Sequence, residues 1–303
     1  MSSTTEPARR ERSARSFTEV QRPDGARLAV YTEGPASPDL VVVFSHGWQA
    51  TASVWDQVVR HLPHDRARIV RYDQRGHGAS TPGRARPSIA LLGDDLKAVI
   101  DATVPARTPV VLVGHSMGGM AVTALVAQYP HLIGSTVCAV VLAATTSGGL
   151  DTSAAGHPWS RRLVGISRHA MAAVCIRAPR PAWHVRQMVR PRPYPQPPID
   201  LAARWFRALM QHDVTGRLEA LGRIPVHIVV GEKDQLIPAE HALRLADEIA
   251  TARVRVVPGG SHRLPTQHPE ALLAVLEQAC QQARSAVRPR RSRWRRPHIA
   301  ATT

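Results

Sequence analysis

The chain has 303 residues, of which 44% are hydrophobic, enough for one large domain with a sizeable core. Its longest purely apolar run, residues 137–144, is too short to cross a bilayer, and the polar, basic residues 1–17 lack the apolar segment of a secretory signal. The formal net charge of +16 allows an anionic partner without identifying one. Three widely spaced cysteines indicate neither a disulfide framework nor a zinc site. These features argue against a membrane-spanning or disulfide-rich secreted protein and favour a cytoplasmic one.

Short apolar runs alternate with helical patterns along most of the chain. The runs that predict strands lie at residues 17–21, 27–32, 40–44, 68–72, 110–113, 137–143, 226–230 and 254–257. Helices are expected at residues 53–62, 88–102, 120–129, 239–250 and 269–284. A capping-box pattern at Ser53–Asp56 is expected to open the first helix. Strands that alternate with helices predict an α/β fold with a mostly parallel, doubly wound sheet, preceded by a disordered arm over residues 1–16.

The interval 147–222 separates the two expected parts of the core, residues 17–146 and 223–284. It is too long for a simple connection in a compact domain, and it contains a helical pattern at residues 201–211. We interpret it as a helical cap inserted over the sheet. A disordered loop is the alternative, although the large aromatic residues of the interval favour burial. Three of them are candidates for lining a substrate pocket: Trp183, Trp205 and Phe206.

One stretch in the middle of the chain combines a buried strand, a sharp turn and a helix. Gly114-His115-Ser116-Met117-Gly118 fits the pattern G-x-S-x-G, in which a serine on a strained turn projects its Oγ clear of the sheet. Glycines on both sides leave room for backbone that a Cβ would contact. The helix that follows would aim its N-terminal N–H groups at a developing oxyanion. This arrangement predicts a nucleophile at Ser116.

A serine nucleophile needs a base and an orienting acid, and suitable segments lie downstream. Five motifs stand in order along the chain: HGW at 46–48, DQRGHGAS at 73–80, GHSMGG at 114–119, GEKDQLIP at 231–238 and GGSH at 259–262. With these motifs the sequence resembles the α/β-hydrolase superfamily, from the strand near Arg27 to the helix ending near Arg284. The resemblance implies an α/β-hydrolase fold and a catalytic triad in the chain order Ser116, Asp234 and His262.

The resemblance also implies a role for each site residue. Ser116 would attack a carbonyl, His262 would transfer the proton, and Asp234 would hold the imidazole in one tautomer. The backbone N–H groups of Trp48 and Met117 would form the oxyanion hole, and the Trp48 indole would line the pocket. The sequence carries no metal or cofactor motif, so we expect a reaction without a cofactor.

Other residues compete for these roles. Glu232 and Asp213 are alternative acids and His268 is an alternative base, although Asp234 fills the family position. Some members of the superfamily carry the acid after the strand that precedes the cap. This chain has Thr145–Ser147 there, so that position supplies no carboxylate. A further group of polar residues falls at positions that shape turns in the family, and we expect them to be structural: His46, Asp73, Arg75, His77 and His115.

A serine at position 116 separates this chain from the haloalkane dehalogenases and epoxide hydrolases of the same fold, which use an aspartate there. We expect a lipase-like serine esterase that cleaves carboxylic esters with an apolar acyl group of small or medium size. A cofactor-free haloperoxidase or perhydrolase, a thioesterase and a C–C bond hydrolase are alternatives on the same triad. A hydrolase fold kept as a non-catalytic binding module is a further alternative.

The last segment, residues 285–303, is expected to be a basic, disordered tail, and residues 284–303 hold seven arginines. One interpretation is a solvated extension without a partner. The other is weak peripheral attachment to an anionic membrane, where each cation near the surface contributes about 1 kcal/mol and Trp294 sits at the interface. A single aromatic residue and the lack of a recognised motif argue against specific nucleic-acid binding.

Overall fold

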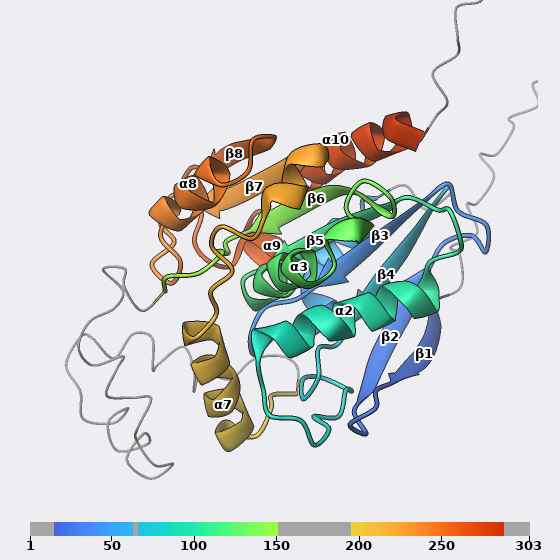
Figure 1. The fold of residues 1–303 in the computed structure, drawn as a ribbon, viewed down its shortest axis with the longest axis vertical. Coiled ribbons are helices and arrows are strands. Elements are labelled where there is room, and N and C mark those ends of the chain that lie inside the picture. The colour runs from blue at the N-terminus through green and yellow to red at the C-terminus, as the bar shows by residue number, and fades with distance from the viewer. Residues whose placement is uncertain (1–14, 63–65, 151–194, 288–303) are drawn as a thin grey trace, which may run out of the picture.

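The computed structural model describes residues 15–62, 66–150 and 195–287, which fold around one central sheet (Figure 1). Its strands lie in the order β1-β2-β4-β3-β5-β6-β7-β8. Their bounds are β1 (Ser16–Gln21), β2 (Arg27–Glu33), β3 (Leu40–Ser45), β4 (Ala67–Tyr72), β5 (Val110–His115), β6 (Val137–Ala143), β7 (Val226–Gly231) and β8 (Ala252–Val257). The pairs β1–β2 and β2–β4 are antiparallel, and the pairs from β4 onward in this order are parallel. The expected mostly parallel α/β sheet is confirmed.

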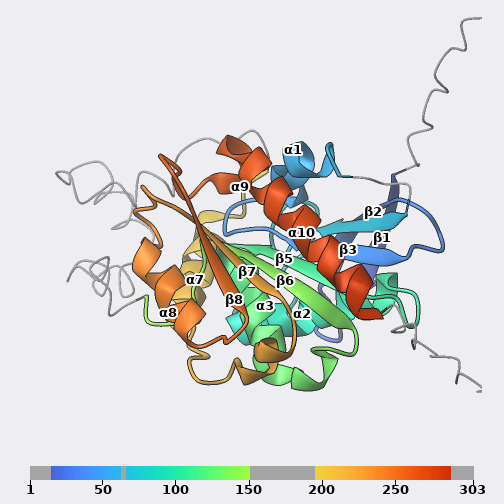
Figure 2. The ribbon, with the colours of Figure 1, turned by 90° about the horizontal axis from the view of Figure 1, so that it is seen from above.

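Helices cover both faces of the sheet (Figure 2). One face carries α2 (Ile89–Thr103), α3 (Met117–Gln128) and α8 (Ala239–Asp247), and the other carries α1 (Asp56–Val59), α9 (Leu264–Gln267) and α10 (Pro269–Val287). Alternate residues of a strand enter the two cores: Val41 and Val43 pack on the α2 and α3 side, whereas Val42 and Phe44 pack on the α10 side. Burial on both faces explains why the central parallel strands β3, β5 and β6 are nearly continuous apolar runs.

The first expected helix differs from the prediction. It consists of a 3₁₀ turn, η1 (Ala52–Trp55), followed by the single α turn of α1. The expected capping box at Ser53–Asp56 is wrong, because the turn begins after Thr51 and no side chain there caps it. Instead the Ala52 N–H group donates to the Asp73 carboxylate at 2.7 Å. A residue from a distant loop therefore satisfies an N–H group at the start of this turn, where no local side chain caps it.

Several element ends also depart from the prediction. Helix α3 begins at Met117, earlier than expected, and a short 3₁₀ turn, η2 (Pro130–Leu132), follows it. Ser16 pairs with Thr32 in the first strand and is not part of the arm. Helix α10 continues to Val287, so the first residues assigned to the tail are helical. The rest of the arm and of the tail, residues 1–14 and 288–303 with Trp294, lies outside the described residues.

Within the interval that we interpret as a cap, the structure describes α7 (Ile199–Met210) and most of η4 (Glu219–Arg223), which ends one residue beyond it. The buried side of α7, which includes Trp205, packs against the start of α3. Residues 151–194, and Trp183 among them, lie outside the described residues, so the cap as a whole stays a prediction. None of the helices in the described part of the chain combines the length and the apolar character that a membrane crossing requires.

Candidate active site

Ser116 lies on the sharp turn between β5 and α3. Its backbone adopts φ 53° and ψ −121°, a conformation that a residue other than glycine rarely holds without support. The end of β6 provides that support, because the Ser116 N–H group donates to the Ala143 carbonyl at 2.9 Å and the Thr145 hydroxyl donates to the Ser116 carbonyl at 2.8 Å. Sequence reasoning did not identify this role of Thr145, which depends on the pairing of β5 with β6.

The glycines around Ser116 meet backbone at close range. A Cβ on Gly118 would lie 2.1 Å from the Ser45 carbonyl oxygen, and a Cβ on Gly114 would lie 2.6 Å from the Gly118 carbonyl oxygen. Both distances are shorter than real Cβ contacts, so a side chain at either position would displace backbone. Gly118 therefore packs directly against the end of β3, and Gly114 packs against the first turn of α3, so neither position has room for a side chain.

The three residues of the expected triad come together at the carboxyl ends of β5, β7 and β8. The His262 Nε2 atom lies 2.9 Å from the Ser116 Oγ atom, and the His262 Nδ1 atom lies 2.8 Å from the Asp234 Oδ2 atom. Because an ionised carboxylate only accepts hydrogen bonds, Nδ1 carries the ring proton and Nε2 is free to accept the serine hydroxyl proton. The geometry matches that of a nucleophile, a general base and an orienting acid.

Asp234 follows β7, and its side chain is fully buried. Burial by itself raises the pKa of this carboxyl group, but the neighbouring His262 and the N–H groups of Leu236 and Ile237 outweigh that effect, so its pKa lies below the ordinary value. The two N–H groups donate to Oδ1 at 2.9 and 3.0 Å. The carboxylate is therefore ionised at neutral pH and fixed in orientation on both oxygens.

The alternative acids and base lie in other surroundings. Glu232 accepts a hydrogen bond from a loop N–H group at 2.7 Å, and Asp213 accepts one within its own turn at 3.0 Å. His268 lies 3.4 Å from the Glu270 carboxylate at the start of α10. The structure thus brings together the three residues that the resemblance implies and places these alternatives elsewhere.

Comparison with known proteins shows the family to which the chain belongs. A model of the α/β hydrolase family matches residues 42–275, which is most of the chain. The chain belongs to the α/β hydrolase family. Membership confirms the fold that the sequence motifs predict.

Individual relatives of this α/β hydrolase match over nearly their whole length. It is 27% identical to the bifunctional esterase/perhydrolase of Acinetobacter calcoaceticus over 266 residues, which cover 84% of this chain and 95% of the relative. It is 28% identical to the non-heme haloperoxidase of Rhodococcus erythropolis over 273 residues, which cover 85% and 97%. Among solved structures, a hydrolase from Pseudomonas aeruginosa is similar with a TM-score of 0.63 and 25% identity, covering 86% of this chain and 97% of that one.

The N–H groups expected to form an oxyanion hole lie on two turns beside Ser116. Met117 is the first residue of α3, so its N–H group has no acceptor within the helix. The turn that carries Trp48 touches the serine, since a Cβ on Gly47 would lie 3.2 Å from the Ser116 Cβ. The role of both N–H groups in this hydrolase stays a prediction that their location supports.

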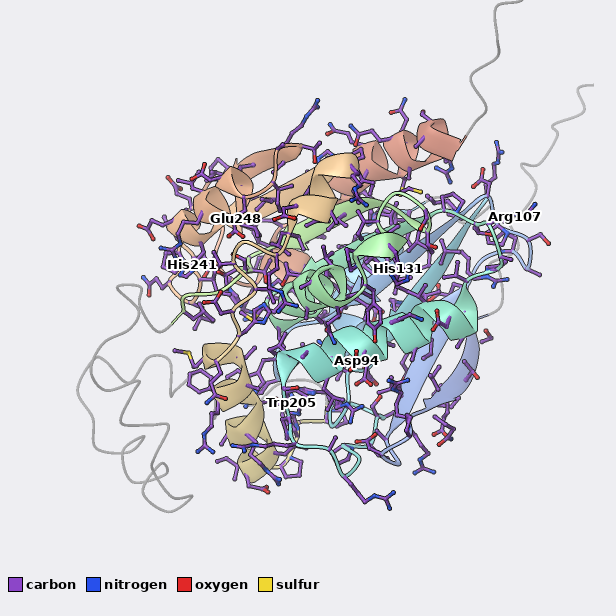
Figure 3. All side chains as sticks on the ribbon, viewed as in Figure 1. Asp94, Arg107, His131, Trp205, His241 and Glu248 are labelled. Carbon is purple, nitrogen blue, oxygen red and sulfur yellow. The ribbon has the colours of Figure 1, made fainter. Side chains whose placement is uncertain are left out.

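Aromatic side chains connect the Trp48 turn to α7. The Trp48 indole N–H donates to the Ala202 carbonyl at 3.1 Å, and the ring centroids of Trp48 and Phe206 are 5.3 Å apart. Trp205, which Figure 3 labels on α7, is 1% exposed and packs in the same apolar cluster as Leu92. Trp48 and Phe206 are partly buried at the margin of that cluster. Their surroundings suit lining residues, whereas Trp205 lies inside the packing that holds α7.

The charged residues of the DQRGHGAS motif brace neighbouring loops, as expected for structural positions. The Asp73 carboxylate accepts hydrogen bonds from the Ala52 and Ala79 N–H groups at 2.7 and 3.0 Å. Arg75 forms an ion pair with Asp95 at 2.5 Å, and each side chain is 1% exposed. Breaking such a buried pair from one side leaves an uncompensated charge, so these residues fix the loop beside the site.

Two histidines join the turns around the site. The His46 Nε2 atom accepts a hydrogen bond from the Gln74 N–H group at 2.9 Å, while its Nδ1 atom lies 2.7 Å from the Gly47 carbonyl oxygen. Burial lowers the pKa of His46 to about 4, so the ring is neutral and can accept. The His77 Nδ1 atom lies 3.1 Å from the Arg75 carbonyl oxygen. Both rings hold turns together, in agreement with the sequence interpretation.

Proposed function

We propose that this α/β hydrolase cleaves carboxylic esters through an acyl-enzyme. The observation that carries the proposal is the continuous chain of hydrogen bonds from the Ser116 Oγ atom through His262 to the Asp234 carboxylate. A serine hydroxyl alone is a weak nucleophile, and an adjacent neutral imidazole held in one tautomer activates it.

The reaction has two stages. In the first, Ser116 Oγ attacks the ester carbonyl carbon while His262 Nε2 takes the hydroxyl proton, and the resulting oxyanion accepts hydrogen bonds from the Met117 and Trp48 N–H groups. Collapse of this intermediate expels the alcohol, which receives the proton from His262. In the second stage, a water molecule attacks the acyl-serine with His262 as base, and the acid is released. Asp234 stabilises the imidazolium in both stages.

The side chains around the site favour an apolar substrate. An apolar cluster extends from the start of α3 to α7, with partly buried members at its margin: Trp48, Phe206, Met210 and Leu236. Apolar surface removed from water contributes roughly 25 cal/mol per Å² to binding. We therefore assign the protein carboxylic esters with a small or medium apolar acyl group.

Substitution of the triad tests this function. Wild-type protein should hydrolyse short p-nitrophenyl esters and react covalently with a fluorophosphonate at Ser116. Ser116→Ala should lower kcat by about 10⁴-fold or more and abolish labelling, because the hydroxyl group that attacks the carbonyl carbon is removed. His262→Gln should cause a loss of similar size, and Asp234→Asn should lower kcat by about 10³- to 10⁴-fold because the imidazole tautomer is no longer held.

Ser135→Ala is the matched control, since Ser135 is exposed, donates to the His131 carbonyl and precedes β6, at the end of the sheet opposite the triad. Its rate and labelling should equal those of wild type. Turnover by Ser116→Ala at the wild-type rate would refute the proposal. Absence of labelling and of hydrolysis in wild type across esters and thioesters would favour a non-catalytic binding protein.

Perhydrolysis is a second candidate, favoured by the similarity to an esterase/perhydrolase and to a haloperoxidase. Hydrogen peroxide would replace water in attacking the acyl-serine, which gives a peracid and free Ser116. The peracid then oxidises bromide to hypobromous acid and becomes the carboxylic acid. Acetate- and peroxide-dependent bromination that approaches the ester rate, and that Ser116→Ala abolishes, would support this activity.

A further inference from the structure

His115 is the last residue of β5, directly before Ser116, and it is 7% exposed. Its Nε2 atom lies 2.7 Å from the carbonyl oxygen of His262. The centroids of the two imidazole rings are 5.0 Å apart, with a 47° angle between their planes. The residue before the proposed nucleophile therefore contacts the backbone of the proposed base, although their positions differ by 147.

The partners of the His115 ring determine where its proton is. A carbonyl oxygen only accepts hydrogen bonds, so Nε2 carries the hydrogen and donates it. Within the described residues Nδ1 has no hydrogen-bond partner, and a Cβ on the adjacent Gly47 would lie 2.9 Å from it. Burial, followed by the nearby His262, lowers the pKa of His115 to about 3, so the ring is neutral at physiological pH.

The carbonyl that His115 binds belongs to the loop between β8 and α9. Two backbone hydrogen bonds hold the start of this loop, where the Gly260 N–H group donates to the Val257 carbonyl at 3.0 Å and the Lys233 N–H group donates to the Gly260 carbonyl at 2.7 Å. The bond from His115 holds the same loop two residues later, at the peptide group that bears the His262 side chain.

We propose that His115 is a positioning residue for the base, because its Nε2–H bond fixes the His262 backbone relative to the serine that follows His115 in the chain. The proposal rests on the esterase function proposed above, in which His262 takes the Ser116 proton. A neutral ring suits this role, since a second positive charge beside His262 would oppose the charge that the base gains during the reaction. A displacement of a reacting group by about 1 Å can reduce a rate by about 10²-fold.

Two substitutions in the full-length chain distinguish the effect of losing the hydrogen-bond donor from the effect of losing the volume of the ring. His115→Leu removes the donor, and we expect kcat for a p-nitrophenyl ester to fall about 30-fold while KM stays within about twofold. His115→Gln places an amide N–H group near the position of Nε2, and it should restore kcat to within about fivefold of wild type. The matched control is His61→Leu, since His61 also bonds a backbone carbonyl, that of Gln57 at 3.0 Å, but on the surface. This control should leave kcat unchanged.

A measurement on the wild-type protein keeps the proposal testable if a variant fails to fold. In ¹⁵N-histidine NMR spectra, the His115 ring should remain the neutral Nε2–H tautomer from about pH 8 to about pH 5, where an ordinary histidine titrates. The signal is assigned by its absence from any one variant that folds, His115→Leu, His115→Gln or His115→Asn. An Nδ1–H tautomer, or a ring that titrates near pH 6.5, would contradict the proposal.

The outcomes distinguish this proposal from the function on which it rests. Persistent turnover by Ser116→Ala would overturn both. An inactive Ser116→Ala together with wild-type kcat in His115→Leu would leave the esterase mechanism standing and refute the positioning role. Equal losses of kcat in the Leu and Gln variants would also refute it, because rescue by an amide donor is what distinguishes a hydrogen bond to His262 from packing.

Discussion

The turn around Ser116 leaves no space for a side chain where it meets β3. Gly118→Ala would place a Cβ 2.1 Å from the Ser45 carbonyl oxygen, and β3 is paired with a strand on each side, so its backbone cannot retreat freely. We expect this substitution to destabilise the protein by about 2 to 4 kcal/mol and to abolish fluorophosphonate labelling. Thermal unfolding followed by circular dichroism measures the first effect.

A second glycine provides the comparison. Gly222→Ala adds the same methyl group where no atom lies within 4 Å, and its Tm should stay within about 2 °C of wild type. If Gly118→Ala matched Gly222→Ala in both Tm and ester hydrolysis, the backbone at the turn would have moved to accommodate the added Cβ. That result would contradict the prediction.

Site residues differ in how far their surroundings could be predicted from sequence. Ser116, Asp234 and His262 stand in short motifs whose neighbouring residues identify them, and the structure places the His262 ring within hydrogen-bond distance of the other two side chains. Thr145 and the contact made by His115 carry no such local signal. They depend on strand pairing and on a loop that is distant in sequence, which single-residue patterns do not encode.

Among the elements, α7 presents two adjacent aromatic residues in different surroundings. Trp205 is 1% exposed, so Trp205→Ala should leave a cavity and cost about 3 to 5 kcal/mol of stability. Phe206 is partly exposed beside Trp48, so Phe206→Ala should raise KM for a butyrate ester by about threefold or more, with little change in Tm. Thermal unfolding and KM for acetate and butyrate esters distinguish the two effects.

Ile199→Ala is the control on the same helix, because Ile199 is 42% exposed and lies outside the apolar cluster. It should change neither Tm nor the ratio of butyrate to acetate KM. If Phe206→Ala also left that ratio unchanged, α7 would not contact the acyl group.

The elements themselves could be located from sequence where burial governs the pattern. The central parallel strands β3, β5 and β6 are buried along their whole length and form nearly continuous apolar runs, so their predicted positions agree with the structure within a few residues. The failures lie where tertiary contacts replace local signals. Asp73 satisfies the donor at the first helical turn in place of a capping side chain, and Met117-Gly118-Gly119 forms the first turn of α3 despite the low helix propensity of glycine.

At the scale of the whole molecule, buried neutral histidines link stability to pH. Burial is the leading cause that lowers the pKa of four of them, to about 4 for His46, His212 and His241 and to about 3 for His115. In the unfolded chain these histidines bind protons near pH 6.5, whereas in the folded protein they stay neutral at that pH. The free energy of unfolding therefore falls as the pH drops below about 6.5, by up to about 1.4 kcal/mol per pH unit for each group. We expect Tm to fall by at least about 5 °C between about pH 7 and pH 5.

A histidine variant checks the cause of this effect. The His212 ring lies 3.1 Å from the Thr123 hydroxyl, and His212→Gln keeps a donor there without a group that titrates. This variant should lose less stability between pH 7 and pH 5 than wild type, whereas replacement of the exposed His61 should make no difference. A wild-type Tm that is constant over this range would contradict the prediction.

β8 forms the edge of the sheet beside β7, and the loop that bears His262 follows it. Ser116 follows β5, which is paired with β3 on one side and β6 on the other. Peripheral elements open locally at a lower free energy than central ones. In a chain from which β8 had detached, β5 would remain paired with β3 and β6, so the turn that carries Ser116 would be kept. The proposed base, His262, would be displaced from it. Under the proposed mechanism such a chain would not hydrolyse esters although most of its sheet is intact, so ester turnover would report on the docking of the final strand rather than on folding in general.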